Sequence, residues 1–300
     1  MFVVTGATGN TGRVIATRLL DAGKKVRVIS RSADHLKPLV TRGAEPFVAD
    51  LSDHAALQKA FTGAEAVYAM IPPSATSQDY RAEQRRVTDA LAGALQSAGV
   101  KHVVALSSVG ADKPSGTGPV AGLHELENKL NTISGLNVVH LRPGYFMENT
   151  LGQVRAIPAM GKMAGPLKGD LKMPFIATQD IANAAADLLL RLDFTGNQTR
   201  ELLGQRDLSY NEAAQIIGKA IEKPDLQYAE FSAEQVKPVF IQLGMSANIA
   251  DLILEMSAAL NSGHMRALEP RSAKNTTATS FETFVQEQFL PLYKTQASAA

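Results

Sequence analysis

Residues 3–12 read VVTGATGNTG, which places Gly6, Gly9 and Gly12 within seven positions near the start of the chain. A short Val-rich run precedes the glycines, and residues 13–22 follow them with apolar positions at helical spacing. A strand, a glycine-rich turn and a helix in this order predict a loop that holds the pyrophosphate of a dinucleotide at the helix N-terminus. The alternative is a glycine-rich turn that binds no ligand.

Each glycine of this loop has a separate expected role. Gly6 permits the sharp turn, Gly9 brings the main chain close to the pyrophosphate, and Gly12 lets the helix pack closely on the sheet. Unpaired N–H groups and the positive dipole end of the helix would bind the anion. The loop also contains three residues with side-chain donors, Thr8, Asn10 and Thr11.

The first half of the chain alternates strand-like and helix-like segments. The expected strands are 2–5, 25–30, 45–49, 65–70, 100–106 and 137–141. The expected helices are 13–22, 33–41, 55–61, 78–98 and 123–134. Strands separated by helices of this length predict βαβ units, and their order predicts an α/β fold with a doubly wound parallel sheet of the Rossmann type.

After Arg142-Pro143 the pattern becomes less regular. Helical stretches are expected at 179–192, 209–221 and 232–260, with a strand-like piece near 199–203. We therefore expect a dinucleotide-binding domain and a smaller, mainly helical substrate-binding lobe that returns to the first domain near 172–203. The proposed bounds are 1–150 for the domain, 151–293 for the lobe and 294–300 for a frayed tail. The Gly- and Pro-rich loop at 111–122 is expected to be mobile.

The end of the second expected strand bears on which dinucleotide binds. The sequence there is VISRS over residues 28–32, without the acid that would bind the ribose 2′-hydroxyl of NAD. Arg31 and Ser32 instead offer donors for a 2′-phosphate, so NADP(H) is favoured over NAD. The alternative is that Arg31 is an ordinary solvated surface residue.

Two further segments belong to the same expected groove. Asp50 follows the third strand and is expected to bind the adenine amino group, while Leu51 covers the ring. The residues after the fourth strand are expected to line the ribose, namely Met70, Ile71 and Pro72. The alternative in both places is an ordinary turn.

Composition excludes several other classes of protein. The net charge is +1 and no basic stripe is present, which argues against nucleic-acid and membrane-surface binding. The chain has no Cys, and its six His show no metal-ligand spacing, so neither disulfides nor a metal site are expected. No apolar run reaches the roughly 18–20 residues of a membrane span, and the N-terminus does not read as a signal peptide. We expect a cytoplasmic protein. The sequence leaves its oligomeric state open, a homodimer included.

Six motifs together resemble a known superfamily. GATGNTG, SRS, ADLSD and LSSVGA, in this order, resemble the short-chain dehydrogenase/reductases. LRPGYFMEN at 141–149 and PFIATQDI at 174–181 are similar to its atypical NmrA-like branch. The resemblance is clear over roughly residues 1–190. It implies NADPH-dependent quinone or dye reduction, or redox sensing without turnover.

The resemblance also implies where chemistry should occur. Ordinary members carry a Tyr-x-x-x-Lys pair on the helix after the fifth strand, and here those two places fall on Val120 and His124. His124 is the nearest substitute, either as a nicotinamide-ribose ligand or as a proton carrier. Ser107 lies where the superfamily has its substrate-binding serine. Pro143 and Tyr145 are expected beside the nicotinamide, with Tyr145 either an acid or a wall.

These observations favour an NADPH-dependent oxidoreductase that transfers hydride to a quinone-like small molecule. A quinone accepts hydride readily because its product anion is delocalised, so a missing Tyr–Lys pair suits such an acceptor. Candidate apolar walls for the acceptor are Met147, Met160, Met163 and Phe175. The alternative for each methionine is an ordinary core residue. The main alternative is a non-catalytic NADP(H) sensor that regulates a partner protein. An epimerase or dehydratase with tightly held NAD is a weaker alternative.

Overall fold

A computed structural model describes residues 1–297 and contains a central sheet of seven strands in the order β10-β6-β5-β4-β1-β2-β3. All neighbouring strands of this sheet are parallel. The strands are β1 (Phe2–Val4), β2 (Val26–Ser30), β3 (Glu45–Val48), β4 (Ala66–Ala69), β5 (His102–Leu106), β6 (Asn137–Pro143) and β10 (Asn197–Leu202). The α/β fold with a doubly wound parallel sheet is therefore confirmed.

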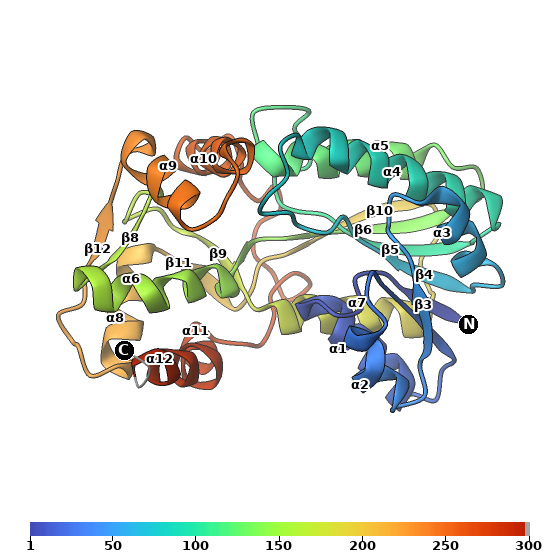
Figure 1. The fold of residues 1–300 in the computed structure, drawn as a ribbon, viewed down its shortest axis with the longest axis horizontal. Coiled ribbons are helices and arrows are strands. Elements are labelled where there is room, and N and C mark those ends of the chain that lie inside the picture. Colours follow the sequence, from blue (N-terminus) through green and yellow to red (C-terminus); the bar gives the residue numbers. More distant parts are fainter. Residues whose placement is uncertain (298–300) are drawn as a thin grey trace.

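Helices cover both faces of this sheet (Figure 1). One face carries α3 (His54–Phe61), α4 (Tyr80–Ser97) and α5 (Ala121–Asn131). The other face carries α1 (Asn10–Asp21), α2 (Lys37–Val40) and α7 (Thr178–Arg191). Because apolar side chains project from both faces of a parallel sheet, two separate cores form, one under each helix layer.

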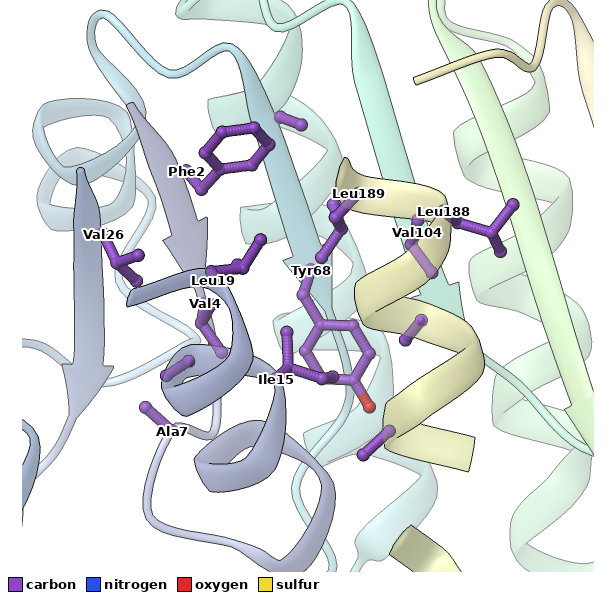
Figure 2. Packing of buried hydrophobic residues seen from close by; sticks show 14 of the residues in the cluster. Phe2, Val4, Ala7, Ile15, Leu19, Val26, Tyr68, Val104, Leu188 and Leu189 are labelled. Carbon is purple, nitrogen blue, oxygen red and sulfur yellow. The ribbon is translucent and has the colours of Figure 1, made fainter. Parts of the chain in front are cut away.

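The core under α1 and α7 is centred on Tyr68 of β4 (Figure 2). Its ring is buried between Ile15 and Leu19 of α1 and the apolar face of α7 (Figure 2). Its hydroxyl lies 2.9 Å from Thr11 Oγ1, which satisfies the one polar atom of the ring. Burial raises the pKa of the Tyr68 phenol, so it remains protonated.

The remaining elements form a lobe beyond the carboxyl ends of the strands (Figure 1). Its strands are β7 (Tyr145–Phe146), β8 (Met163–Gly165), β9 (Met173–Ile176), β11 (Arg206–Leu208) and β12 (Tyr228–Glu230). Its α-helices are α6 (Gln153–Met160), α8 (Tyr210–Ala220), α9 (Ala233–Gln242), α10 (Ala247–Asn261), α11 (Phe281–Phe284) and α12 (Leu290–Ala297). A third core, rich in aromatic residues, holds most of them together.

Strand β1 pairs with β2 on one side and with β4 on the other, so the strand order reverses at β1. In doubly wound sheets, ligands bind outside the carboxyl ends of the strands at such a reversal. The glycine turn after β1 lies at this point. No helix among the described residues is both long and apolar enough to cross a membrane.

The structure bears on three expectations about the later segments, and the single helix at 232–260 is wrong. The stretch 232–260 is two helices, because the chain turns at Gly244, whose φ is +94°. The loop at 111–122 is packed, since Ala111, Thr117 and Val120 are buried and α10 lies against the 3-10 helix Gly118–Val120. Residues 294–297 complete α12, and the rest of the expected tail, 298–300, lies outside the described residues.

Candidate functional site

The glycine turn joins β1 to α1 through close main-chain contacts. Gly6 has φ +58°, in the left-handed region that favours glycine, and a Cβ there would lie 2.7 Å from Met70 Sδ. A Cβ on Gly12 would lie 2.3 Å from the Gly6 carbonyl oxygen. Both positions require glycine for reasons internal to the protein.

Gly9 differs from the other two glycines. A Cβ there would meet only the Gly6 carbonyl oxygen, at 3.4 Å, and nothing else within 4 Å. Gly9 is also the N-cap residue of α1, and no side chain caps the helix. The first-turn N–H groups of α1 therefore lack a side-chain acceptor, and the space beside them is open. This arrangement fits an anion such as a pyrophosphate.

A groove of about 270 Å³ extends from this turn along the carboxyl ends of β1, β2 and β3. It brings together sequence-predicted residues from four separate segments, namely Gly6, Thr8, Arg31, Asp50, Leu51 and Pro72. The expected residues Ser32, Met70 and Ile71 are neighbours in sequence of lining residues but do not line the groove themselves. The order of these segments matches an adenosine half-site beside the pyrophosphate turn.

Three lining residues come from a segment that the sequence did not indicate, namely Glu83, Arg86 and Val87 of α4. They share one face of α4 because they are three and four positions apart. That spacing was visible in the sequence, but nothing there indicated which face of the helix would meet the groove. Arg86 is thus a second arginine in the lining of the groove, in addition to Arg31.

Asp50, which lines the groove after β3, is held in place by hydrogen bonds. Its Oδ1 accepts hydrogen bonds from the N–H and the hydroxyl of Ser52, at 2.8 and 2.7 Å. These bonds, together with the charge of Arg31, hold the pKa of Asp50 below its ordinary value. Asp50 is therefore a carboxylate at neutral pH, and its Oδ2 is left to accept a further donor. The N–H of Ser32 donates to Ser30 Oγ at 3.3 Å.

The Ser107 hydroxyl, just after β5, forms a hydrogen bond within the protein. It is 3% exposed and donates to Glu127 Oε1 at 2.5 Å. Arg142 holds the same carboxylate through two hydrogen bonds, at 2.9 and 2.6 Å. This buried cluster ties the end of β5 to α5 and β6. The Ser107 hydroxyl proton is thereby directed to Glu127.

His124 is likewise engaged at both ring nitrogens. Its Nδ1 lies 2.8 Å from the Ala111 carbonyl oxygen, and its Nε2 lies 2.8 Å from Asn128 Nδ2. A carbonyl only accepts and an amide nitrogen only donates, so the ring carries its proton on Nδ1. His124 therefore fastens the loop after β5 to α5.

Tyr145 follows Pro143 and Gly144 at the end of β6 and enters an aromatic cluster. Its hydroxyl lies 2.9 Å from that of Tyr210, and its ring centroid lies 5.3 Å from that of Phe175. Burial raises the pKa of the Tyr145 phenol, although hydrogen bonds from Tyr210 and Asn149 oppose the rise. Tyr145 is half-buried, whereas Tyr210 is 4% exposed.

The expected apolar walls of an acceptor pocket are mostly core residues. Met147, Met163 and Phe175 are fully buried in the lobe, while Met160 is 42% exposed at the end of α6. The burial of Met147, Met163 and Phe175 fits the alternative that they are core residues. The sequence could not distinguish a buried side chain from one lining a cavity, because both are apolar.

The N-terminus of α10 is hydrogen-bonded to the segment that connects β4 to α4. The Ser246 N–H donates to the Ala75 carbonyl at 2.9 Å, and the Tyr80 N–H donates to Asn248 Oδ1 at 2.9 Å. Tyr80 also donates from its hydroxyl to the Pro72 carbonyl at 2.9 Å. The groove wall at Pro72 is therefore connected to the lobe through Tyr80.

A family model described as the NmrA-like family matches residues 1–286. Among curated proteins, an NAD(P)H azoreductase from Xenophilus azovorans is 30% identical over 258 residues, which cover 86% of each chain.

Two solved structures share the fold. One is the NADPH-dependent quinone oxidoreductase QOR2 from Escherichia coli, complexed with NADPH, with 24% identity and a TM-score of 0.81 over 96% of this chain and 100% of that one. The other is the Citrobacter sp. triphenylmethane reductase complexed with NADP(H), with 22% identity and a TM-score of 0.81 over 96% of this chain and 99% of that one.

Proposed function

This chain belongs to the NmrA-like family, and we propose that it is an NADPH-dependent oxidoreductase that transfers hydride to a quinone or a similar conjugated acceptor. The activities named for its similar proteins support this choice, since one relative is an azoreductase and two proteins of the same fold are a quinone oxidoreductase and a triphenylmethane reductase. Azo compounds, quinones and triphenylmethane dyes are all conjugated and electron-poor. The proposed class of acceptor is therefore a conjugated, electron-poor small molecule.

The observations that carry the proposal are the groove lined by Gly6 and Thr8 and, in the same turn, the open space at Gly9. The open space at Gly9 and the uncapped first turn of α1 would hold the pyrophosphate. Arg31 and Arg86 would bind the 2′-phosphate at the far end, and Asp50 and Leu51 would bind the adenine. A groove that pairs two guanidiniums with no acid at the end of β2 favours NADPH over NADH.

Bound NADPH would supply the hydride, so the protein's own contribution is position, exclusion of water and a proton. Pro143 is the last residue of β6, which lies two strands from β4 in the sheet, and Tyr145 begins β7. Both residues lie where the lobe covers the ends of the strands. In our proposal they border the nicotinamide. His124 and the cluster of Ser107, Glu127 and Arg142 fix the loop and strands that form this border.

The test is steady-state oxidation of NADPH, followed as loss of nicotinamide absorbance with a panel of quinones, azo dyes and simple ketones. We expect turnover with the conjugated acceptors and little with the ketones. Equal turnover of simple ketones would contradict the choice of acceptor. No turnover with any member would contradict the enzymatic proposal.

A second candidate function is an NADP(H) sensor. It is favoured by Val120 and His124, which stand where the superfamily's Tyr and Lys are expected, and by the link from the groove wall through Tyr80 to α10. Under this reading NADP⁺ and NADPH bind with different affinities and nothing is turned over. Calorimetry with both forms, beside the acceptor panel, separates the two functions.

A further inference from the structure

Three polar side chains were expected near the nicotinamide, and two of them have their polar atoms hydrogen-bonded within the protein. Ser107 donates its proton to Glu127, and His124 has both ring nitrogens bonded within the protein. Tyr145 differs, because its partners, the Tyr210 hydroxyl and the Asn149 side chain, can both donate to its oxygen. A hydroxyl can accept one hydrogen bond and still donate its own proton. Among these three, Tyr145 alone retains a proton that it can pass to a ligand.

Tyr210 is placed to support such a transfer. Its hydroxyl lies 2.9 Å from the Tyr145 hydroxyl, and its ring is held by stacking on Tyr228 at 4.7 Å and by an edge contact with Phe175 at 5.9 Å. The Tyr228 hydroxyl points elsewhere and donates to the Leu167 carbonyl at 2.9 Å. Phenylalanine would fill the Tyr210 site equally well, and burying a hydroxyl has a desolvation cost. Packing alone therefore does not account for the paired phenols.

We propose that Tyr145 is the proton donor to the reduced acceptor, and that Tyr210 is the positioning residue that donates a hydrogen bond to the Tyr145 oxygen. This inference rests on the proposed function. As hydride reaches the acceptor, negative charge forms on its oxygen or nitrogen. The Tyr145 O–H bond breaks and a new O–H or N–H bond forms on the acceptor. The Tyr145 phenolate, stabilised by Tyr210, then regains a proton from water.

The burial of the two phenols fits Tyr145 as the proton donor and Tyr210 as the hydrogen-bond donor to it. Burial and the neighbouring Tyr145 raise the pKa of Tyr210 well above its ordinary value, so Tyr210 stays protonated and acts only as a hydrogen-bond donor. A donor hydrogen bond to a phenolate stabilises the charged form. Loss of the Tyr210 hydroxyl should therefore raise the pKa of Tyr145 and slow proton transfer from it.

The first test uses the ligand-free protein. Difluorotyrosine at position 145 lowers the phenol pKa towards neutrality, and its ¹⁹F signal is titrated with and without Tyr210→Phe. We expect Tyr210→Phe to raise that pKa, with a roughly tenfold fall in the ionisation constant. Tyr228→Phe is the matched control, because it also removes a buried hydroxyl and keeps the ring, and it should leave the titration unchanged. An unchanged titration in Tyr210→Phe would overturn the inference.

The second test uses turnover of a quinone at saturating NADPH. Tyr145→Phe should lower kcat by roughly 100-fold and Tyr210→Phe by roughly tenfold, with KM and NADPH affinity retained. Tyr228→Phe should keep the wild-type kcat. If Tyr210→Phe does not fold, an unchanged kcat in Tyr145→Phe still overturns the inference. Turnover by the wild type with an unaffected Tyr145→Phe contradicts this inference alone, whereas no turnover by the wild type contradicts the proposed function as well.

Discussion

A Cβ on Gly12 would lie 2.3 Å from the carbonyl oxygen of Gly6, so the first turn of α1 packs directly on the turn that follows β1. Three positions earlier, a Cβ on Gly9 would find no atom within 4 Å except that same oxygen, at 3.4 Å. Gly12 is therefore required by the fold, whereas Gly9 faces open space beside an uncapped helix N-terminus. This difference separates structural from ligand-related glycines in the motif.

The first prediction follows from that difference. Gly9→Val should fold normally, because its side chain enters open space, and should lose NADPH binding, because the side chain occupies the place of the pyrophosphate. Gly12→Val should lose more than about 2 kcal/mol of unfolding free energy through the main-chain clash. Calorimetry and urea denaturation measure the two effects. Normal NADPH affinity in a folded Gly9→Val would refute the loop assignment.

The second prediction concerns cofactor choice. Arg31→Asp places a negative charge at the end of β2, so it should repel the 2′-phosphate and offer an acceptor to a ribose hydroxyl. NADPH affinity should fall roughly 10- to 100-fold, about 1.4–2.8 kcal/mol, while NADH affinity is kept or improved.

The control for this charge change is Arg85→Asp. Arg85 is exposed on α4 next to Arg86 but does not line the groove. The ratio of NADPH to NADH affinity should stay near that of the wild type. If both variants shift the ratio equally, the effect is one of net charge, and Arg31 does not contact the phosphate.

The structure brings together more of the residues expected at the strand ends than of those expected in the lobe. The groove is built from short segments at strand ends, where Gly6, Arg31 and Asp50 each follow a recognisable strand, and the parallel sheet brings those ends together. Arg86 was missed because the register of α4 against the sheet is a tertiary property. The aromatic cluster was also missed, since Tyr145 and Tyr210 are 65 positions apart and meet only through β7, β9 and β11.

The burial of Glu127 could not be predicted from the sequence either. On α5 it reads as one of several charged helix residues, yet it is 5% exposed and bonded to both Ser107 and Arg142. Its neighbour Glu125 is paired with Arg81 nearer the surface. The helical pattern alone does not say which acid of α5 faces the sheet.

The third prediction uses these two acids. Glu127→Ala should lower the unfolding free energy by about 3–5 kcal/mol, because it leaves the Arg142 guanidinium buried without its partner. Glu125→Ala on the same helix should cost about 1 kcal/mol, since its ion pair with Arg81 is only partly buried. Urea denaturation of both variants measures the contrast. Equal losses would mean that the Glu127 cluster does not stabilise the strand ends.

The fourth prediction concerns pH. His140 is 1% exposed on β6, its Nε2 lies 2.8 Å from Asn131 Oδ1, and burial lowers its pKa below the ordinary value of about 6.5. The unfolded chain therefore binds a proton at His140 more readily than the folded one does. Stability from this group is full above pH 6.5 and falls as the pH drops towards the folded pKa.

The pH effect is measured as the difference in unfolding free energy between the wild type and His140→Gln from pH 5 to 8. Glutamine keeps a donor for Asn131 but does not titrate. The wild type should lose stability relative to the variant as the pH falls below 6.5. A difference that does not vary with pH would show that His140 does not contribute to the acid sensitivity.

The central claim is that the first turn of α1, beside Gly9, binds the diphosphate of a nicotinamide coenzyme. Isothermal titration of cofactor-stripped protein with NADPH and NADH tests it most directly. We predict one site per chain, with NADPH bound at least tenfold more tightly than NADH. Titrations in which neither coenzyme binds would contradict the account.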